Sequence, residues 1–445
     1  MKTIRMGAAA LAASALLTAA ACGNGGTADT ASGEGSGSAS QSGTQEKPVT
    51  LKFYSYNLAI ASQVEGTKKL ISEFEAAHPT IKIDAVPVAS TDINAKVQAD
   101  IVAGTAPDVA QLTFDGLDFA VNNFNAKPLE DFVPADEMAE NFKDFSPNGL
   151  KLGQLNGKTY GLPFTFSTPV LFYNADLFRK AGLDPDQPPK TWEEVKQAGL
   201  AIKEKTGEAG AIINGASGGD WIIQAVIGSN GGSVLSDDRK TITFGEPEAV
   251  GAIRMWQDMI QSGASNKMNQ GEAMEAFSQG KTGMLLFTSA LQSSFLASAK
   301  AGGWELRTAK MPAFDGKPTT PVNSGSALFV LSDDKAKQQA AWQFLKFVTS
   351  KRGYTIITSE IGYLPLRPSI VDDPEYLKGW VEENPLVKPN LEQLETLRPW
   401  VSYPGSNWKQ VETLLQDAVS KSILGKEDPA AILQDAANRA QALIQ

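Results

Sequence analysis

Aromatic side chains set among glycine, serine and asparagine are the residues of this chain whose types and spacing could bind a small molecule. They are Tyr54, Trp221, Tyr363, Tyr403 and Trp408. An aromatic ring stacks on the apolar face of a sugar, while neighbouring amide, hydroxyl and carboxylate groups hydrogen-bond to its hydroxyls. The pattern therefore favours a site for a neutral, hydroxyl-rich ligand.

The chain contains almost no histidine or cysteine. His78 is the one histidine and Cys22 the one cysteine. No intrachain disulfide and no Cys/His zinc cluster can form, and a Ser-His-Asp or Cys-His nucleophile would need His78. Because His78 ends a helical pattern just before Pro79, we expect it to make a helix-terminal hydrogen bond. We expect no catalytic residue, no metal and no cofactor.

Other motifs that suggest chemistry are weak. Gly280, Lys281 and Thr282 are similar to the end of a phosphate-binding loop, but Glu275 stands where that motif requires glycine. Acidic pairs such as Asp184 and Asp186 lie in proline-rich turns, where carboxylates usually cap the backbone. A glycosidase needs two facing carboxylates, so a secreted carboxylate-dependent glycosidase stays as a remote alternative.

Composition places the chain among globular proteins of more than one domain. It has 445 residues, 42% hydrophobic and 20% charged, with a formal net charge of -10. At about 150 residues per domain, two or three domains are expected. The acidic balance gives no broad basic face for phosphate, so we expect no nucleic-acid partner.

The spacing of apolar residues predicts alternating strands and helices. Alternation over residues 49–53 and 81–85 predicts strands, and helical stripes end near His78 and near Gly104. Later strands are expected at 170–173 and 327–331, and a helix at 253–260. A last helix begins at Asp428 as N-cap with Pro429 following. Its expected buried side is Ile432, Ala436, Ala440 and Leu443. This order is typical of an α/β protein.

The N-terminus has the pattern of an export signal. Lys2 and Arg5 precede an apolar run without charge that ends at Cys22. The residues before Cys22 resemble a bacterial lipobox, so residues 1–21 are predicted to be a lipoprotein signal peptide and Cys22 the lipidated residue. A plain secretory signal is the alternative. Residues 22–47 are rich in glycine and serine and predict a flexible tether.

Longer motifs resemble a known family. The stretch from Ser167 to Phe178 and its continuation to Glu194 closely resemble family 1 extracellular solute-binding proteins of ABC importers, which include glycerol-3-phosphate-binding and sugar-binding members. Further matching segments follow in family order at residues 74–79, 104–108, 160–163, 277–281 and 362–365. The resemblance covers the chain from about residue 50 to its end.

The resemblance implies an α/β, two-lobed periplasmic-binding-protein-like fold of type II, with the ligand cleft between lobes joined by hinge strands. Lobe 1 is expected at residues 48–162 and 288–377, and lobe 2 at residues 163–287 and 378–445.

The resemblance also implies site residues. Relatives place a stacking aromatic at Trp221 and a ligand-contacting tyrosine at Tyr363. Tyr403 is matched to a position where the glycerol-3-phosphate binder carries an arginine, which favours a neutral sugar over a phosphoester. Tyr54, Asn57, Asp115 and Trp408 are added by residue type and local composition. The expected ligand-binding residues are therefore Tyr54, Asn57, Asp115, Ser167, Trp221, Thr288, Ser289, Gly325, Tyr363, Tyr403 and Trp408.

The function implied is the substrate-binding component of an ABC importer that captures a mono- or oligosaccharide. The partners expected are the permease transmembrane subunits and, through Cys22, the membrane. The protein is expected to be a monomer on the extracellular face of the bacterial cytoplasmic membrane. A receptor for glycerol-3-phosphate, a glycerophosphodiester or another phosphorylated polyol is the alternative. Trp221→Ala is expected to weaken binding and leave thermal stability nearly intact.

Overall fold

The computed structural model describes residues 48–215 and 219–444. The predicted signal peptide, the tether and Cys22 lie outside the described residues. Contacts group the chain from Lys47 onward into one unit. Within residues 48–215 and 219–444, no helix is both long and apolar enough to cross a membrane.

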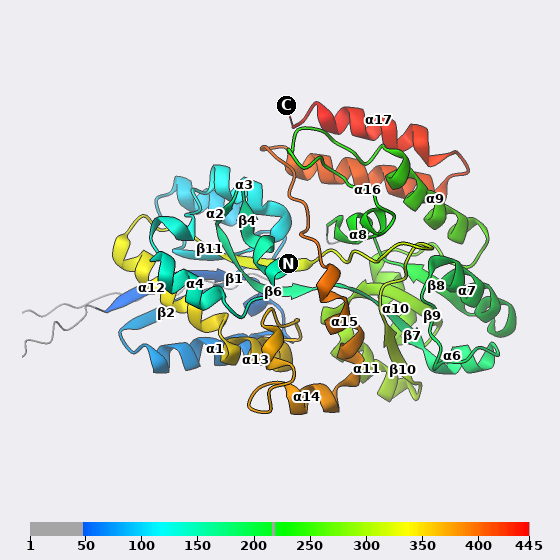
Figure 1. Cartoon of the computed structure of the whole chain (residues 1–445), viewed down its shortest axis with the longest axis horizontal. Helices are drawn as coiled ribbons and strands as arrows, with labels where there is room; N and C mark the ends of the chain where they lie inside the picture. Colours follow the sequence, from blue (N-terminus) through cyan, green and yellow to red (C-terminus); the bar gives the residue numbers. More distant parts are fainter. Residues whose placement is uncertain (1–47, 216–218, 445) are drawn as a thin grey trace, which may run out of the picture. The chain divides into compact units, whose positions relative to one another are not determined.

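The first of two main sheets has the strand order β2-β1-β3-β11-β6. Its strands are β1 (Val49–Ser55), β2 (Ile81–Pro87), β3 (Val109–Thr113), β6 (Gly161–Ser167) and β11 (Ser324–Val330). β1 pairs in parallel with β2 and β3, whereas β11 runs antiparallel to β3 and β6. The strands predicted near residues 49, 81 and 327 are confirmed. Figure 1 shows this sheet with α12 (Lys335–Val348) beside it.

Helices on the first sheet bury aromatic rings against it. Phe74 of α1 packs on Phe344 of α12 with ring centroids 5.0 Å apart, and Phe344 lies 5.2 Å from Phe53 of β1. α1 ends at Ala77 and His78 caps it: the His78 backbone N–H donates to the Phe74 carbonyl at 2.9 Å, the helix-terminal hydrogen bond that was predicted. The helices between β1 and β6 and after β11 are α1 (Val64–Ala77), α2 (Ile93–Val102), α3 (Leu117–Asn123), α4 (Ala135–Phe142), α5 (Pro147–Leu150), α12 (Lys335–Val348) and α13 (Lys351–Ile356). A two-stranded ribbon of β4 (Gln154–Leu155) and β5 (Lys158–Thr159) precedes β6. We call the first sheet with these elements lobe 1.

The second sheet has the order β10-β7-β9-β8. Its strands are β7 (Pro169–Asn174), β8 (Ala209–Ile213), β9 (Thr282–Thr288) and β10 (Leu306–Ala309). Its helices are α6 (Ala175–Lys180), α7 (Trp192–Thr206), α8 (Trp221–Ser229), α9 (Pro247–Gln261), α10 (Gln270–Ser278), α11 (Gln292–Gly302), α16 (Trp408–Leu424) and α17 (Pro429–Gln441). α14 (Lys378–Glu383) and α15 (Lys388–Glu392) lie in the segment that leads back to this sheet. We call this group lobe 2.

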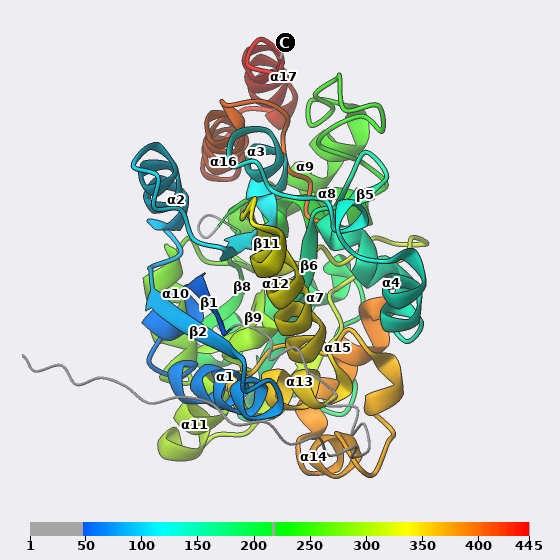
Figure 2. The ribbon, with the colours of Figure 1, turned by 90° about the vertical axis from the view of Figure 1, so that its left-hand side faces the viewer.

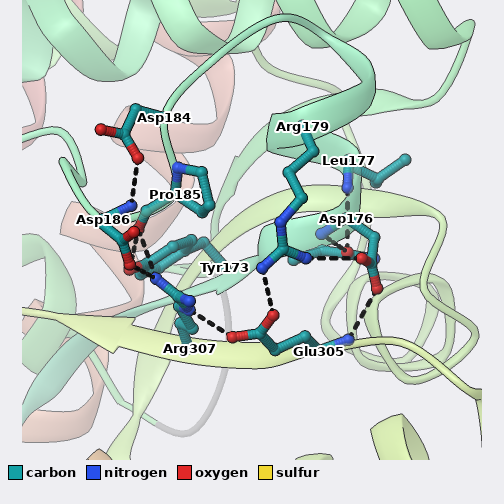
Figure 3. Close-up of polar contacts among 10 residues, drawn as sticks. Tyr173, Asp176, Leu177, Arg179, Asp184, Pro185, Asp186, Glu305 and Arg307 are labelled. Atoms are coloured by element: carbon teal, nitrogen blue, oxygen red, sulfur yellow. Dashed lines mark hydrogen bonds and ion pairs between the residues drawn. The ribbon is translucent and has the colours of Figure 1, made fainter.

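A charged network fastens the edge strand β10 to β7 and α6. Figure 3 shows Arg307 between Glu305 and Asp186, and Arg179 paired with the same Glu305. Asp184 accepts the backbone N–H of Asp186 at 2.9 Å, which confirms that these carboxylates form a turn. The network lies on the solvent side of lobe 2, since the Asp186 side chain is 74% exposed.

The chain passes between the lobes at positions that differ from those expected. β6 belongs to the first sheet as far as Ser167, and β7 of the second sheet starts at Pro169, so the first crossing is at Thr168 rather than after residue 162. Residues 288–309 stay with the second sheet because β10 pairs with β7. The second crossing therefore falls between Ala309 and Ser324, not at 287–288. Strand pairing therefore moves the first crossing by about six residues and the second by more than twenty residues from the positions that the resemblance implied.

The two C-terminal helices, α16 and α17, lie side by side on lobe 2 (Figures 1 and 2). Asp428 accepts the N–H of Ala430 at 2.8 Å and Pro429 opens α17, as predicted. The buried face differs in part: it is formed by Leu433, Ala436, Ala437 and Ala440, while Ile432 and Leu443 are half-buried.

Candidate functional site

A cavity of about 350 Å³ lies between the two sheets. The carboxyl ends of β3, β6 and β9 open onto it, at Thr113, Ser167 and Thr288. Ligands of open α/β sheets bind at such strand ends. We call this cavity the cleft. Its lining comprises hydroxyl and amide side chains (Ser62, Gln63, Ser90, Thr113, Ser167, Gln270, Thr288, Ser294, Ser324), rings (Tyr56, Trp221, Phe287, Tyr363, Trp400), and Ile60, Met274, Ala290, Leu291 and Gly325.

The described lining of the cleft carries no Asp, Glu, Lys, Arg or His. Burial raises the pKa of Tyr56, and it raises the pKa of Tyr363 well above its ordinary value, so both phenols stay neutral at physiological pH. The cleft thus offers ring faces, neutral hydrogen-bond donors and neutral acceptors. Such a surface suits an uncharged ligand with many hydroxyls.

Five of the predicted residues line the cleft: Ser167, Trp221, Thr288, Gly325 and Tyr363. The Ser167 and Thr288 hydroxyl oxygens are 2.7 Å apart, so a hydrogen bond joins the end of β6 to the end of β9. This bond links the two sheets at the base of the cleft. Trp221 is the first residue of α8 and only 3% exposed.

Gly325 lies where strands β11 and β6 approach each other closely. Its φ is 115°, and a Cβ there would lie 2.1 Å from the backbone oxygen of Thr165. Only glycine fits where β11 lies so close to β6 with positive φ. The cleft wall at this position is therefore bare backbone.

Gln63 is a cleft residue that the sequence reasoning missed. Its side-chain amide N–H donates to the Tyr363 hydroxyl at 3.3 Å, and it is 7% exposed. Its Oε1 has no hydrogen-bond partner among the described residues. An unpartnered buried acceptor is costly, and a ligand hydroxyl would satisfy it.

Three further predicted residues, Tyr54 and Asn57 of lobe 1 and Ser289 of lobe 2, lie outside the cleft lining. Tyr54 is 1% exposed and donates its hydroxyl to Asp100. Asn57 is fully buried beneath the cleft, where its Oδ1 accepts from Gln111 at 2.8 Å. The Ser289 hydroxyl accepts a backbone N–H from the β6–β7 junction at 3.3 Å. The Tyr54 and Ser289 hydroxyls and Asn57 Oδ1 have protein partners, while Asn57 Nδ2 is buried without a partner among the described residues. None of the three side chains lines the cleft.

Asp115, Tyr403 and Trp408 also lie outside the cleft lining. They belong to a group of residues behind its wall, which we call the acidic cluster: Asp115, Asp220, Tyr403, Trp408, Lys409 and Glu412. Lys409 Nζ lies 3.2 Å from Asp115 Oδ2 and 3.0 Å from Glu412 Oε2. The Lys409 ammonium also lies 4.7 Å from the centre of a Trp408 ring. Because Tyr403 does not line the cleft, the tyrosine at that position no longer argues against a phosphate ligand. That argument now rests on the uncharged lining of the cleft.

The cluster perturbs its own carboxyl groups. Burial, followed by the charges of Asp115 and Asp220, raises the pKa of Glu412 to about 8, although Lys409 opposes this shift. Burial also raises the pKa of Asp220. Both groups are nearly inaccessible, with Asp220 at 0% and Glu412 at 2% exposure. These two carboxyl groups with raised pKa values therefore lie behind the cleft wall and do not line the cavity.

Sequence signals for the missed residues were present but ambiguous. Tyr56 follows Tyr54 by two positions, and Trp400 lies three residues before Tyr403. In each pair, the structure brings the first-named ring to the cleft and buries the other elsewhere. Residue type alone cannot separate such neighbours.

Comparison with known proteins gives a family match over most of the chain. Residues 69–389 match the family described as bacterial extracellular solute-binding protein. A putative binding protein of Brucella abortus (strain 2308) is 28% identical over 408 residues, covering 89% of this chain and 93% of the relative. The sn-glycerol-3-phosphate-binding periplasmic protein UgpB of Escherichia coli (strain K12) is 26% identical over 424 residues, covering 91% and 94%.

Solved structures share the fold. The cyclic alpha-maltosyl-1,6-maltose binding protein from Arthrobacter globiformis superposes with a TM-score of 0.78 at 25% identity, covering 89% of this chain and 99% of that one. UgpB from Mycobacterium tuberculosis, in complex with glycerophosphocholine, gives 0.76 at 21% identity, covering 88% and 98%. The two-lobed α/β fold of type II periplasmic binding proteins, expected from the sequence, is confirmed.

Proposed function

Because the chain belongs to the bacterial extracellular solute-binding protein family, we propose that it captures a neutral carbohydrate in its cleft and delivers it unaltered to an ABC permease. The observation that carries this proposal is the uncharged lining of hydroxyls, amides and rings. Trp221, Tyr363 and Trp400 supply surfaces for sugar rings, and Gln63 supplies an acceptor for a hydroxyl.

A phosphorylated polyol is the second candidate, because curated relatives carry glycerol-3-phosphate in their names. A phosphate held by charged donors gains about 1.5–3 kcal/mol from each such hydrogen bond. The described lining contains no Lys or Arg to supply them. The cleft therefore favours the neutral ligand.

Hydrolysis of the bound sugar is not part of the proposal. A glycosidase needs two carboxyl groups flanking the scissile bond. The described lining of the cleft has none, and Asp115, Asp220 and Glu412 lie behind its wall. A receptor of this kind returns its cargo intact.

The cleft residues come from both lobes, and this division explains how a bound ligand could favour closure of the lobes. Tyr56, Gln63 and Tyr363 come from lobe 1, while Trp221 and Thr288 come from lobe 2. A ligand that contacts both sets binds more tightly when the lobes are close, so it shifts the population toward the closed form. We propose that this form is the one presented to the permease, and that Cys22 holds the protein on the extracellular face of the membrane.

A binding screen tests the proposal. Thermal unfolding is measured with maltose, maltotetraose, trehalose, glycerol-3-phosphate and glycerophosphocholine. A ligand present at 100 times its dissociation constant adds about 2.7 kcal/mol of stability. We expect stabilisation by a neutral sugar and none by either phosphate compound. Tight binding of a phosphate compound, or recovery of a sugar in cleaved form, would contradict the proposal.

A further inference from the structure

Asp220 is a buried carboxylate that precedes Trp221 and contacts the cleft only through other residues. Its exposure is 0%. Oδ1 accepts the indole N–H of Trp400 at 2.7 Å, and Oδ2 accepts the Tyr403 hydroxyl at 2.8 Å. Burying a carboxylate is unfavourable unless donors surround it, and here each oxygen has at least one.

Trp400 is held at both its backbone and its ring. Its backbone N–H donates to Asn323 Oδ1 at 2.7 Å, while the indole N–H is fixed by Asp220. The ring lines the cleft and is 5% exposed. A side chain with both anchors has little freedom to rotate, so the ring face it presents to a ligand is set in advance.

The start of α8 is shaped to receive this segment. Gln224, one turn after Asp220, accepts the backbone N–H of Val401 at 2.9 Å and donates to Asp220 Oδ1 at 3.0 Å. A Cβ at Gly219 would lie 2.2 Å from the Trp400 ring, so the indole packs directly on residue 219. Gly219 also has a φ of 103°, which glycine adopts without strain.

We propose that Asp220 is a positioning residue that sets the two tryptophans of the cleft relative to each other. Asp220 is the N-cap residue of α8, the helix that carries Trp221, and its Oδ1 accepts the indole N–H of Trp400. A carboxylate suits this role better than an amide because it offers two acceptor oxygens, one for Trp400 and one for Tyr403. The consequence for ligand binding rests on the proposed function, whereas the placement of Trp400 does not.

The first measurement needs no ligand. Hydrogen exchange of the indole N–H groups is followed by NMR on the whole protein, and the Trp400 signal is identified by its loss in Trp400→Phe. We expect at least tenfold faster exchange at Trp400 in Asp220→Ala, and near wild-type exchange in Asp220→Asn, which keeps one acceptor. Tyr403→Phe is the matched control, since it removes the other donor and leaves the Trp400 bond. Unchanged exchange in Asp220→Ala overturns the proposal.

Asp220→Leu, which fills the site without an acceptor, replaces Asp220→Ala if that variant does not fold. If neither acceptor-free variant folds, Asp220 is a residue of core stability and the positioning proposal is overturned.

The second measurement separates positioning from a general structural role. Maltotetraose affinity is compared in wild type, Asp220→Ala, Trp400→Phe and the double variant. We expect Asp220→Ala to weaken binding at least tenfold in the wild-type background and less than twofold when Trp400 is already Phe. Equal losses in both backgrounds overturn the proposal. If wild type binds neither maltotetraose nor the other sugars of the screen, the proposed function fails, while the exchange result still decides the placement of Trp400.

Discussion

The described lining of the cleft is uncharged, whereas the acidic cluster behind it is charged, although residues of the two regions are neighbours in the sequence. The described cleft lining is uncharged, although Trp221 and Trp400 belong to it. The cluster holds Asp115, Asp220 and Glu412 with the ammonium of Lys409. Asp220 and Trp221 are adjacent in sequence, yet one faces the cluster and the other the cleft.

This difference shows how charge can organise a neutral site without entering it. A carboxylate in the cleft would carry a desolvation cost on each closure. The same group placed behind the wall orients the rings through N–H and O–H donors. Of the four variants below, two alter the cleft, one alters the cluster, and the last lies outside both.

The largest effect is expected for Trp221→Ala, which removes a wall of the cleft. The side chain is 3% exposed, so its loss costs about 3–5 kcal/mol of unfolding free energy as well as ligand affinity. This revises the expectation that stability would stay nearly intact. Urea denaturation measures the loss, and Trp221→Phe serves as the milder control that retains a ring. A stability change below 1 kcal/mol would show that the ring is not packed as described.

Gln63→Glu introduces a carboxylate into the cleft at nearly constant shape. The side chain is 7% exposed, so an ionised form loses about 1–3 kcal/mol of stability at pH 7.5. Burial raises the folded pKa of the new carboxyl, so this loss disappears as the pH falls below the unfolded value near ~4.3. Thermal unfolding at several pH values, with Gln63→Leu as a neutral control, checks the result. Equal pH dependence in both variants would mean that the cleft tolerates charge.

Glu412→Gln removes an acid from the cluster. The folded pKa of Glu412 is raised to about 8, so the folded state holds a proton that the unfolded state releases above ~4.3. Wild-type stability therefore falls as pH rises from about 4 to 8. The variant should lack this fall and be more stable at pH 8 by about 1–3 kcal/mol. Thermal unfolding from pH 4.5 to 8.5 is the measurement, and parallel curves for both proteins would refute the assignment.

The smallest effect is expected at the charged network on the edge of lobe 2 (Figure 3). Asp186 pairs with Arg307 while 74% exposed. Exposed ion pairs contribute about 0–1 kcal/mol. Asp186→Asn should change stability by less than about 1 kcal/mol and leave sugar affinity unchanged, as measured by denaturation and calorimetry. An altered affinity would mean that the edge of the second sheet communicates with the cleft.

Local structure in lobe 1 could be predicted from sequence because each element carries its own periodicity. Leu51 and Phe53 alternate with polar residues along β1, and Leu70 and Phe74 recur along α1. The crossings between lobes could not be found in this way. The second crossing depends on which strand β10 pairs with, and its short run of residues 306–309 has no pattern that identifies β7 as its partner.

The site was predictable only in part for a related reason. Family resemblance marked Trp221 and Tyr363, which lie on elements with strong motifs. Asn57 and Tyr403 were chosen by type and local composition, and the structure places both in hydrogen bonds with buried groups. Whether a tyrosine or asparagine faces a ligand depends on a distant partner, here Gln111 or Asp220, that no local pattern reveals.

Trp400 lines the cleft and is also hydrogen-bonded to a segment that connects the two lobes. Its backbone N–H is bound to Asn323, which lies in the segment that carries the chain from β10 to β11. If one lobe rotates against the other, dihedral angles in that connection change next to the Trp400 backbone, while the indole stays bonded to Asp220. The part of the tryptophan emission change that is lost in Trp400→Phe would then report this motion without any attached dye, because the other seven tryptophans of the chain contribute the rest.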